Sequence, residues 1–229
     1  MNTAIIVAAG KGTRMGPDID KIFLELAGLP VAAHTWRRFE DASSIHQIML
    51  VVREGFQSAF EELARSCNFK KRFDIVVGGK ERQDSVWNGL KAVPVGTEIV
   101  AIQDAARPCT TPALIAATIA AAQRTGAAVA AQRVTDTIKE SADGKLIERT
   151  IDRSRLWSVQ TPQAFRLKVI RQALLAVREK GLFVTDDTAA CELIGQPVEL
   201  VLGPDPNPKV THTADIDYVE SVLRQMSPR

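Results

Sequence analysis

The stretch Ala4-Ile5-Ile6-Val7-Ala8-Ala9-Gly10-Lys11-Gly12-Thr13-Arg14-Met15-Gly16 decides the fold. It opens with a short apolar run rich in β-branched residues, which predicts a buried strand. A loop with three glycines follows at once, and glycine lets a phosphate or another backbone come close. The clustered main-chain N–H groups of such a loop form an anion-binding concavity. With Lys11 and Arg14 in the loop and Lys21 shortly after it, the stretch predicts a polyphosphate site at the end of a first strand.

Two better-known glycine motifs fit this stretch less well. A dinucleotide-binding fingerprint needs G-x-G-x-x-G opening directly into a helix, but Pro17-Asp18 interrupts the chain there. An acidic residue should follow its second strand, and Arg53 stands in that place. A P-loop needs Lys and then Ser or Thr after its last glycine, whereas Pro17 follows Gly16. A tight turn with solvated charges is the structural alternative.

The composition excludes several classes of protein. Of 229 residues, 45% are hydrophobic and 24% charged, and the net charge of +2 gives no case for a nucleic-acid-binding surface. The three cysteines and three histidines are scattered, which favours neither a disulfide framework nor a zinc site. The longest apolar runs have strand length, which indicates no membrane span. The first strand begins too early to leave room for a signal peptide, so we expect a cytoplasmic protein.

Strand and helix patterns alternate along most of the chain. Apolar runs of strand length at 48–52, 73–77, 98–103 and 127–132 are separated by amphipathic helical stretches. This order predicts a single α/β domain over residues 1–229, with a Rossmann-like, mostly parallel twisted sheet and helices on both faces. Ligands bind beyond the carboxyl ends of such strands. The loops 10–21, 78–85 and 104–109 are therefore the candidate site.

The alternation breaks at residues 134–153, which are mostly polar. Thr137-Ile138-Lys139 and Leu146-Ile147-Glu148 flank Asp143-Gly144, which predicts a β-hairpin arm. Because an isolated hairpin is marginal in water, we expect the arm to lean on a second subunit. A loose surface insertion is the alternative.

Strand and helix patterns resume after the arm. A strand at 156–160 returns the chain to the sheet, and Thr161-Pro162-Gln163 is predicted to turn into a helix. A further helix begins at Thr185-Asp186-Asp187, a last strand covers 198–202, and an amphipathic helix starts near residue 214.

The loops supply cations and one acid but no covalent nucleophile. Neither a G-x-S-x-G elbow nor a Cys/His pairing occurs. The charged residues that recur at loop positions are Lys11, Arg14, Lys21, Asp104, Arg107, Arg153 and Lys209. Such a set suits transfer of phosphate-bearing groups, where catalysis is mostly positioning and charge stabilisation.

A series of motifs runs in order along nearly the whole chain. They are Ala8–Gly16 with Lys21, Gly78-Gly79 with Arg82 and Ser85-Val86, Asp104-Ala105-Ala106-Arg107-Pro108, Asp136-Thr137-Ile138-Lys139, Asp152-Arg153 with Leu156-Trp157, Thr161-Pro162-Gln163, Thr185-Asp186-Asp187 and Asn207-Pro208-Lys209-Val210-Thr211. This series resembles the 2-C-methyl-D-erythritol 4-phosphate cytidylyltransferases. The resemblance implies a homodimeric nucleotidyltransferase that condenses CTP with methylerythritol phosphate, using Mg²⁺ and releasing pyrophosphate. The nucleophile would be the substrate's own phosphate.

The resemblance also implies roles for single residues. Arg14 and Lys21 would stabilise the charge that develops at the α-phosphorus of CTP. The residues that would bind the nucleotide are Ala8, Ala9, Gly10, Lys11, Gly12, Gly79, Ser85, Asp104 and Ala105, with Asp104 also a metal-ligand candidate. Those that would hold the second substrate are Arg107, Thr137, Arg153 and Lys209. Thr137 and Arg153 lie on the arm and would act in the partner's site.

Three positions depart from the family pattern. Asp20-Lys21-Ile22 stands where Pro, Lys and Gln are usual, Gln103 where His is common, and Pro208 where an aliphatic residue is usual. One consequence would be an Asp20–Lys21 ion pair, which would weaken the attraction of Lys21 for phosphate.

Other interpretations stay open. A ribitol 5-phosphate cytidylyltransferase would share the fold and the chemistry, although Ala106 favours methylerythritol phosphate. An NAD-binding oxidoreductase has the wrong glycine spacing, and an inactive nucleotide-binding regulator would not need Arg14 and Lys21. Asp104 could be only a turn residue, and Arg107 only an ion-pair partner.

Overall fold

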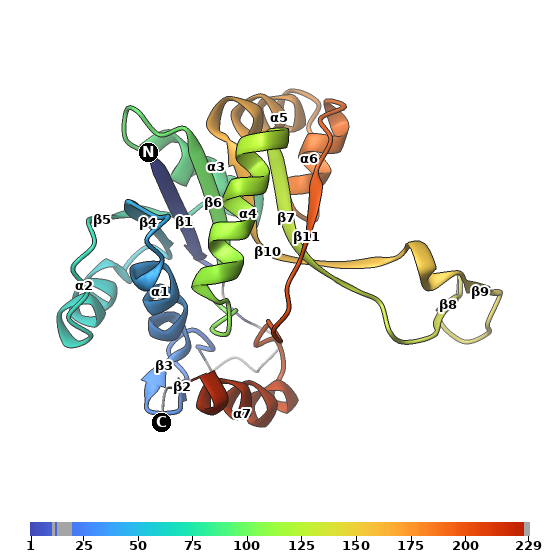
Figure 1. The fold of residues 1–229 in the computed structure, drawn as a ribbon, viewed down its shortest axis with the longest axis horizontal. Coiled ribbons are helices and arrows are strands. Elements are labelled where there is room, and N and C mark those ends of the chain that lie inside the picture. Colours follow the sequence, from blue (N-terminus) through green and yellow to red (C-terminus); the bar gives the residue numbers. More distant parts are fainter. Residues whose placement is uncertain (11, 13–19, 227–229) are drawn as a thin grey trace.

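A seven-stranded sheet in the order β11-β7-β10-β6-β1-β4-β5 forms the centre of the molecule (Figure 1). The computed structural model describes residues 1–10, 12 and 20–226. The strands are β1 Asn2–Ala8, β4 Gln47–Val52, β5 Phe73–Val77, β6 Ile99–Asp104, β7 Ala127–Arg133, β10 Trp157–Arg166 and β11 Glu199–Leu202. β10 pairs antiparallel with β6 and β7, and the other pairs are parallel. The predicted mostly parallel sheet is confirmed.

Helices cover both faces of this sheet, as the alternating pattern predicts. The helices are α1 Val31–Asp41, α2 Gln57–Ser66, α3 Arg82–Ala92, α4 Pro112–Thr125, α5 Leu167–Glu179, α6 Asp187–Leu193 and α7 Ile216–Met226. Residues of α1, α2 and α4 share one buried cluster with Ala4, Ile6 and Ala8. Residues of α3, α5 and α6 share another with Ile5. Because successive strand residues point to opposite faces, β1 is buried on both sides and reads as a continuous apolar run.

The carboxyl ends of three neighbouring strands lie together at one edge of the sheet. Ala8 pairs in register with Val52, and Val7 pairs with Asp104. The loops that follow β1, β4 and β6 therefore begin side by side. α7 packs near this edge, in a third buried cluster that includes Ala106 and Val210. The fold thus brings the predicted candidate loops into one neighbourhood.

Two predicted boundaries are wrong. The stretch 161–166 does not turn into a helix but continues β10, and α5 begins only at Leu167. The reason is tertiary: Gln163 pairs with Ile102 on one side and with Val129 on the other. Pro162 is tolerated in the strand because it lies where the pairing with β7 shifts register. A two-stranded hairpin of β2 Glu25–Leu26 and β3 Leu29–Pro30 is also present and was not predicted.

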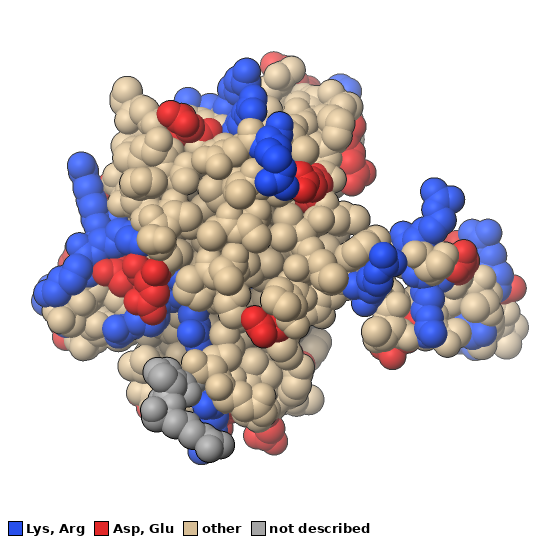
Figure 2. All heavy atoms as spheres, viewed as in Figure 1, with Lys and Arg blue, Asp and Glu red and all other residues tan. Residues whose placement is uncertain are grey.

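The predicted hairpin arm is confirmed, with a different returning strand. β8 Ile138–Glu140 pairs with β9 Arg149–Ile151, not with residues 146–148. The carboxylate of Asp143 accepts hydrogen bonds from the N–H groups of Lys145 and Leu146, and these bonds stabilise the turn between the two strands. The arm extends away from the sheet on two connecting segments and carries many exposed Lys and Arg side chains (Figures 1 and 2). Within residues 1–10, 12 and 20–226, no helix has the length and apolar character needed to cross a membrane.

Candidate active site

A pocket of about 250 Å³ opens at the carboxyl edge of the sheet, and we call it the first pocket. The residues predicted for the nucleotide that line it are Ala8, Ala9, Gly10, Gly12, Gly79, Ser85, Asp104 and Ala105, together with Lys21 and Lys209. The structure therefore brings together residues from the ends of β1 and β6, the start of α3 and a loop before α7. Lys11 and Arg14 lie outside the described residues.

Glycine is required where the β1 loop meets the start of α3. A Cβ atom on Gly78 would lie 2.4 Å from the Cβ of Ala9, and one on Gly79 would lie 2.3 Å from the Cβ of Asp84. The N–H of Gly79 donates to Ser85 Oγ at 3.0 Å. Ser85 is buried, and its hydroxyl donates in turn to the Glu81 carbonyl. This close packing fixes the backbone that forms one wall of the first pocket.

Lys21 reaches the first pocket across Gly12. Gly12 has a φ of +65°, and a Cβ there would lie 3.1 Å from Lys21 Cγ. The Lys21 ammonium donates to the Val210 carbonyl at 3.3 Å. Asp20, for which the sequence suggested Lys21 as a partner, instead binds Arg53 at the end of β4. That expectation was wrong because the carboxylate faces the neighbouring strand end.

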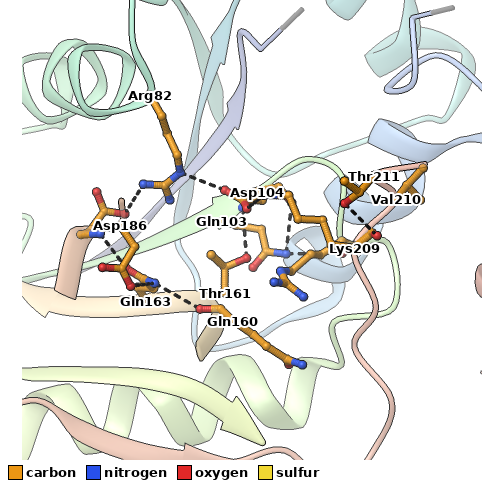
Figure 3. Close-up of polar contacts among 12 residues, drawn as sticks. Arg82, Gln103, Asp104, Gln160, Thr161, Gln163, Asp186, Lys209, Val210 and Thr211 are labelled. Atoms are coloured by element: carbon orange, nitrogen blue, oxygen red, sulfur yellow. Dashed lines mark hydrogen bonds and ion pairs between the residues drawn. The ribbon is translucent and has the colours of Figure 1, made fainter. Parts of the chain in front are cut away.

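Asp104 is the centre of a partly buried charge cluster (Figure 3). Its Oδ1 accepts from Arg82 Nε at 3.1 Å and its Oδ2 from Lys209 Nζ at 2.5 Å, so the two cations reach it from different sides. The other end of the Arg82 guanidinium pairs with Asp187, which is 1% exposed, at 2.9 Å. The backbone N–H of Asp104 donates to Thr161 Oγ1. The start of α3 and the loop before α7 thus meet at the Asp104 carboxylate, and β10 meets its backbone.

The cluster shifts the titration of its members. Burial alone would raise the pKa of Asp104, but Arg82 and Lys209 outweigh it and hold that pKa well below its usual range. Burial raises the pKa of Asp187, because Arg82 compensates only in part. Burial also opposes the charge of Arg82, yet Asp187 and Asp104 together raise its pKa. Asp104 is therefore anionic at neutral pH, and it stays bound to its two cations.

A second, smaller pocket of about 160 Å³ adjoins the first. It shares Arg82, Asp104 and Lys209 with the first pocket and adds Arg107 and Thr185. Arg107 donates to the Asn207 carbonyl at 2.7 Å, and burial lowers its pKa. The two pockets therefore meet at the Asp104–Lys209 pair, with cations on both sides of it.

Thr137 and Arg153 do not join either pocket. Both lie on the arm, away from the sheet edge (Figure 1), and Arg153 donates to the Thr135 carbonyl within the arm. The remaining predicted residues of the second substrate, Arg107 and Lys209, are in place. One chain therefore assembles only part of the predicted set.

The described residues offer little to a metal ion or a thiol mechanism. Among them, no group of three or more His, Cys, Asp or Glu side chains could hold a metal ion. Asp104 retains lone pairs beside its two cations, so it fits a single-ligand role next to a phosphate-bound ion. Burial raises the pKa of Cys109 and of Cys191 to about 12, and such thiols are inert.

No role follows from the sequence for Arg82, Asp187 or Arg53, although the structure places each in an ion pair near the site. Arg82 stands three residues before Ser85, and Asp187 reads as part of a helix start. A charged residue at the start of a helix is usually solvated. Only the structure, in which Arg82 and Asp187 pair with each other away from bulk solvent, reveals a role for them. The signal that could have found Arg53 is its position directly after an apolar strand at the ligand-binding edge.

Comparison with known proteins identifies the family. The family model described as IspD, 2-C-methyl-D-erythritol 4-phosphate cytidylyltransferase, matches residues 2–225. Enzymes of that name from Pelotomaculum thermopropionicum and Geobacillus kaustophilus are 41% and 44% identical to this chain. The matches cover 99% and 96% of the chain, and 95% and 96% of those enzymes.

Solved structures agree with this assignment. The 4-diphosphocytidyl-2C-methyl-D-erythritol synthase of Anaerococcus prevotii superposes with a TM-score of 0.86 at 29% identity, covering 97% of this chain and 96% of that one. The cytidylyltransferase of Thermus thermophilus gives 0.79 at 30% identity, covering 96% and 98%. The chain therefore belongs to the IspD family of 2-C-methyl-D-erythritol 4-phosphate cytidylyltransferases.

Proposed function

We propose that the first pocket binds CTP, that the second binds methylerythritol phosphate, and that the reaction takes place where they meet. The chain is a cytidylyltransferase of the non-mevalonate isoprenoid pathway. The observation that supports this division of the site is the wall shared by the pockets, formed by Arg82, Asp104 and Lys209. Two anionic substrates placed on either side of it would both lie within reach of fixed cations.

The reaction would be an in-line displacement at the α-phosphorus of CTP. A phosphate oxygen of methylerythritol phosphate forms the new P–O bond, the α–β P–O bond breaks, and pyrophosphate leaves with the electron pair. A phosphate monoester has a second pKa of about 6, so its dianion attacks without a strong general base. Lys21 supports the negative charge that develops on the α-phosphate oxygens. Arg14 is proposed for the same task from the family resemblance alone.

The nucleotide would be held mainly by backbone. The N–H groups of residues 8–12 would bind the triphosphate. The rigid wall at Gly79 and Ser85 would read the edge of the cytosine, since both positions are fixed by close packing. Asp104 and Ala105 would face the ribose.

Mg²⁺ would bind chiefly to the triphosphate, because it prefers phosphate oxygens and retained waters to an all-protein cage. Asp104 is the residue of the first pocket that would contribute a ligand. When bound, the ion would neutralise part of the phosphate charge.

The second substrate would be held by Lys209 and Arg107 from one chain and by Thr137 and Arg153 from the arm of a partner. Support for a homodimer comes from the arm itself, whose Leu146 and Ile147 are 73% and 65% exposed. Apolar side chains at the tip of a marginal hairpin need a surface to cover them. We keep the cytoplasm as the predicted location.

Pyrophosphate release with each nucleoside triphosphate and each polyol phosphate tests the proposal. We expect turnover with CTP and methylerythritol phosphate in the presence of Mg²⁺, and loss of turnover when EDTA removes the ion. A higher kcat/KM with ribitol 5-phosphate would overturn the substrate assignment while leaving the chemistry intact.

A further inference from the structure

Arg53 lies beside the first pocket, at the same edge of the sheet, although the sequence gives it no role there. It directly follows β4, whose last residue Val52 pairs in register with Ala8 of β1. Arg53 therefore begins its loop beside Ala9, at the same sheet edge as the first pocket. Its side chain is 21% exposed and is held in two ways: the guanidinium binds the Asp20 carboxylate and lies 4.1 Å above the ring of Phe56.

The partner of Arg53 belongs to the turn that carries Lys21. Asp20 immediately precedes Lys21, and its carbonyl accepts from the N–H of Phe23 at 3.0 Å, which closes the turn. The ring of Phe23 stacks on Phe56, with centroids 5.9 Å apart, and meets the edge of Phe60 at 5.4 Å. The turn 20–23 is therefore attached to the end of β4 and the start of α2 by an ion pair and an aromatic stack.

A second attachment fixes the other side of the same turn. The Ile22 carbonyl accepts from the N–H of Ala32 in α1 at 2.9 Å. The main chain of Lys21 is thus fixed on both sides, by the contacts of Asp20 before it and of Ile22 after it. Its side chain then crosses Gly12 into the first pocket.

The Asp20–Arg53 pair has the burial needed to act as a fixed support. Asp20 Oδ1 and Arg53 Nε are buried and have no hydrogen-bond partner among the described residues. The two side chains are 21% and 25% exposed, so removal of one member would leave the other charge mostly buried without its partner, which is costly. In a solvent-exposed pair, water would replace the lost partner, and removing one member would cost little stability.

We propose that Arg53 is a positioning residue for cytidylyl transfer, which through Asp20 and the Phe23–Phe56 stack sets the place of the Lys21 ammonium in the first pocket. The inference rests on the proposed role of Lys21. A displacement of about 1 Å in such a group can cost up to about a hundredfold in rate. The loss should appear in kcat, because Lys21 acts on charge that develops in the transition state.

The test uses R53Q, D20N and the double variant, with kcat and both KM values from pyrophosphate release and the Kd of CTP from calorimetry. We expect each single variant to lower kcat by about tenfold or more with the Kd of CTP within threefold. The double variant should be no slower than the slower single variant, because both changes break the same contact. R53K, which keeps the cation over Phe56, should recover most of the rate.

The matched control is R65Q, which breaks the Arg65–Glu62 pair in the adjacent α2, where both side chains are 66% exposed. It should leave kcat unchanged. Single-variant kcat values within twofold of the parent, or losses that multiply in the double variant, would overturn the inference. So would a fall in kcat that only tracks the folded fraction measured by urea unfolding. If the parent chain itself released no pyrophosphate, the proposed function would fail. Unchanged kcat values in the variants of an active parent would overturn only the role of Arg53, so the two failures can be distinguished.

Discussion

Gly12 decides how Lys21 enters the first pocket. Its φ of +65° lies in the left-handed region, and the space of its missing side chain is filled by the Lys21 stem. G12A should therefore lower kcat by about tenfold, since the new methyl group displaces the ammonium. It should also cost about 1–2 kcal/mol of stability from the backbone conformation. Pyrophosphate release and urea unfolding measure the two effects.

Gly96 offers a matched control for the backbone cost. It has a φ of +86°, and a Cβ there would meet no atom within 4 Å. G96A should lose similar stability and keep its kcat. Equal kcat values for G12A and G96A would show that the Lys21 stem adapts to the methyl group.

Asp104 gives a pH dependence whose sign follows from its surroundings. Its pKa in the folded chain is lowered by Arg82 and Lys209 despite burial. A lowered carboxyl pKa contributes stability above the unfolded value of about 3.9, and that stability is lost as the pH falls towards the folded pKa. D104N should therefore be less stable than the parent at pH 7, and the difference should shrink below about pH 4. Urea unfolding of both chains across pH 3–7 measures this, and a constant difference would contradict it.

The location of a single residue in the fold could be predicted from the sequence where its position in a motif determines that location. Asp104 ends a strand and Ser85 lies near the start of a helix, both at the ligand-binding edge of the sheet. They therefore reach the first pocket in any sheet of this order. Arg82 and Asp187 could not be predicted, because their pairing depends on how α3 and α6 pack, far apart in sequence. Asp20 was assigned the wrong partner for the same reason, since Arg53 reaches it only through sheet pairing.

At the scale of elements, the period of the apolar residues predicted the strands and helices well and failed at β10. The stretch 161–166 contains Pro162, which favours a turn, yet pairing on both sides overrides this preference. The direction of β10 is also not encoded in its own residues. It matters for the site, because the antiparallel strand brings Thr161 beside Asp104.

Arg82 joins three elements at their ends: it lies at the start of α3 and binds Asp104 at the end of β6 and Asp187 at the start of α6. R82Q would leave Asp187, which is 1% exposed, without its cation, and we expect a loss of roughly 3 kcal/mol in unfolding free energy. Adding D187N removes that buried charge, so R82Q/D187N should recover much of the stability measured by urea unfolding. It should not recover kcat/KM, because Asp104 would still lack its contact with Arg82. Full recovery of both would show that Arg82 acts only on stability.

At the scale of the whole molecule, the arm is the part that one chain does not explain. Its hairpin extends from the sheet (Figure 1), and Leu146 and Ile147 near its tip are exposed. The arm also carries two of the predicted residues, Thr137 and Arg153. If the arm completes a partner's site, light scattering should give a dimer. L146E/I147E should weaken that dimer and raise the KM for methylerythritol phosphate. The Kd of CTP should change little, because the first pocket is built from the body of one chain.

Mixing two inactive variants tests whether a site is shared between chains. In this scheme Lys209 of one chain and Arg153 of its partner act on the same substrate, so K209A and R153A should each be nearly inactive. A heterodimer of the two would contain one site with both residues intact and one with neither. Random exchange of subunits should therefore restore about a quarter of the parent's activity, as the two-fold symmetry of a dimer requires. Were the arm to act on its own chain, every site in the mixture would lack one residue, and the mixture would stay as inactive as its components.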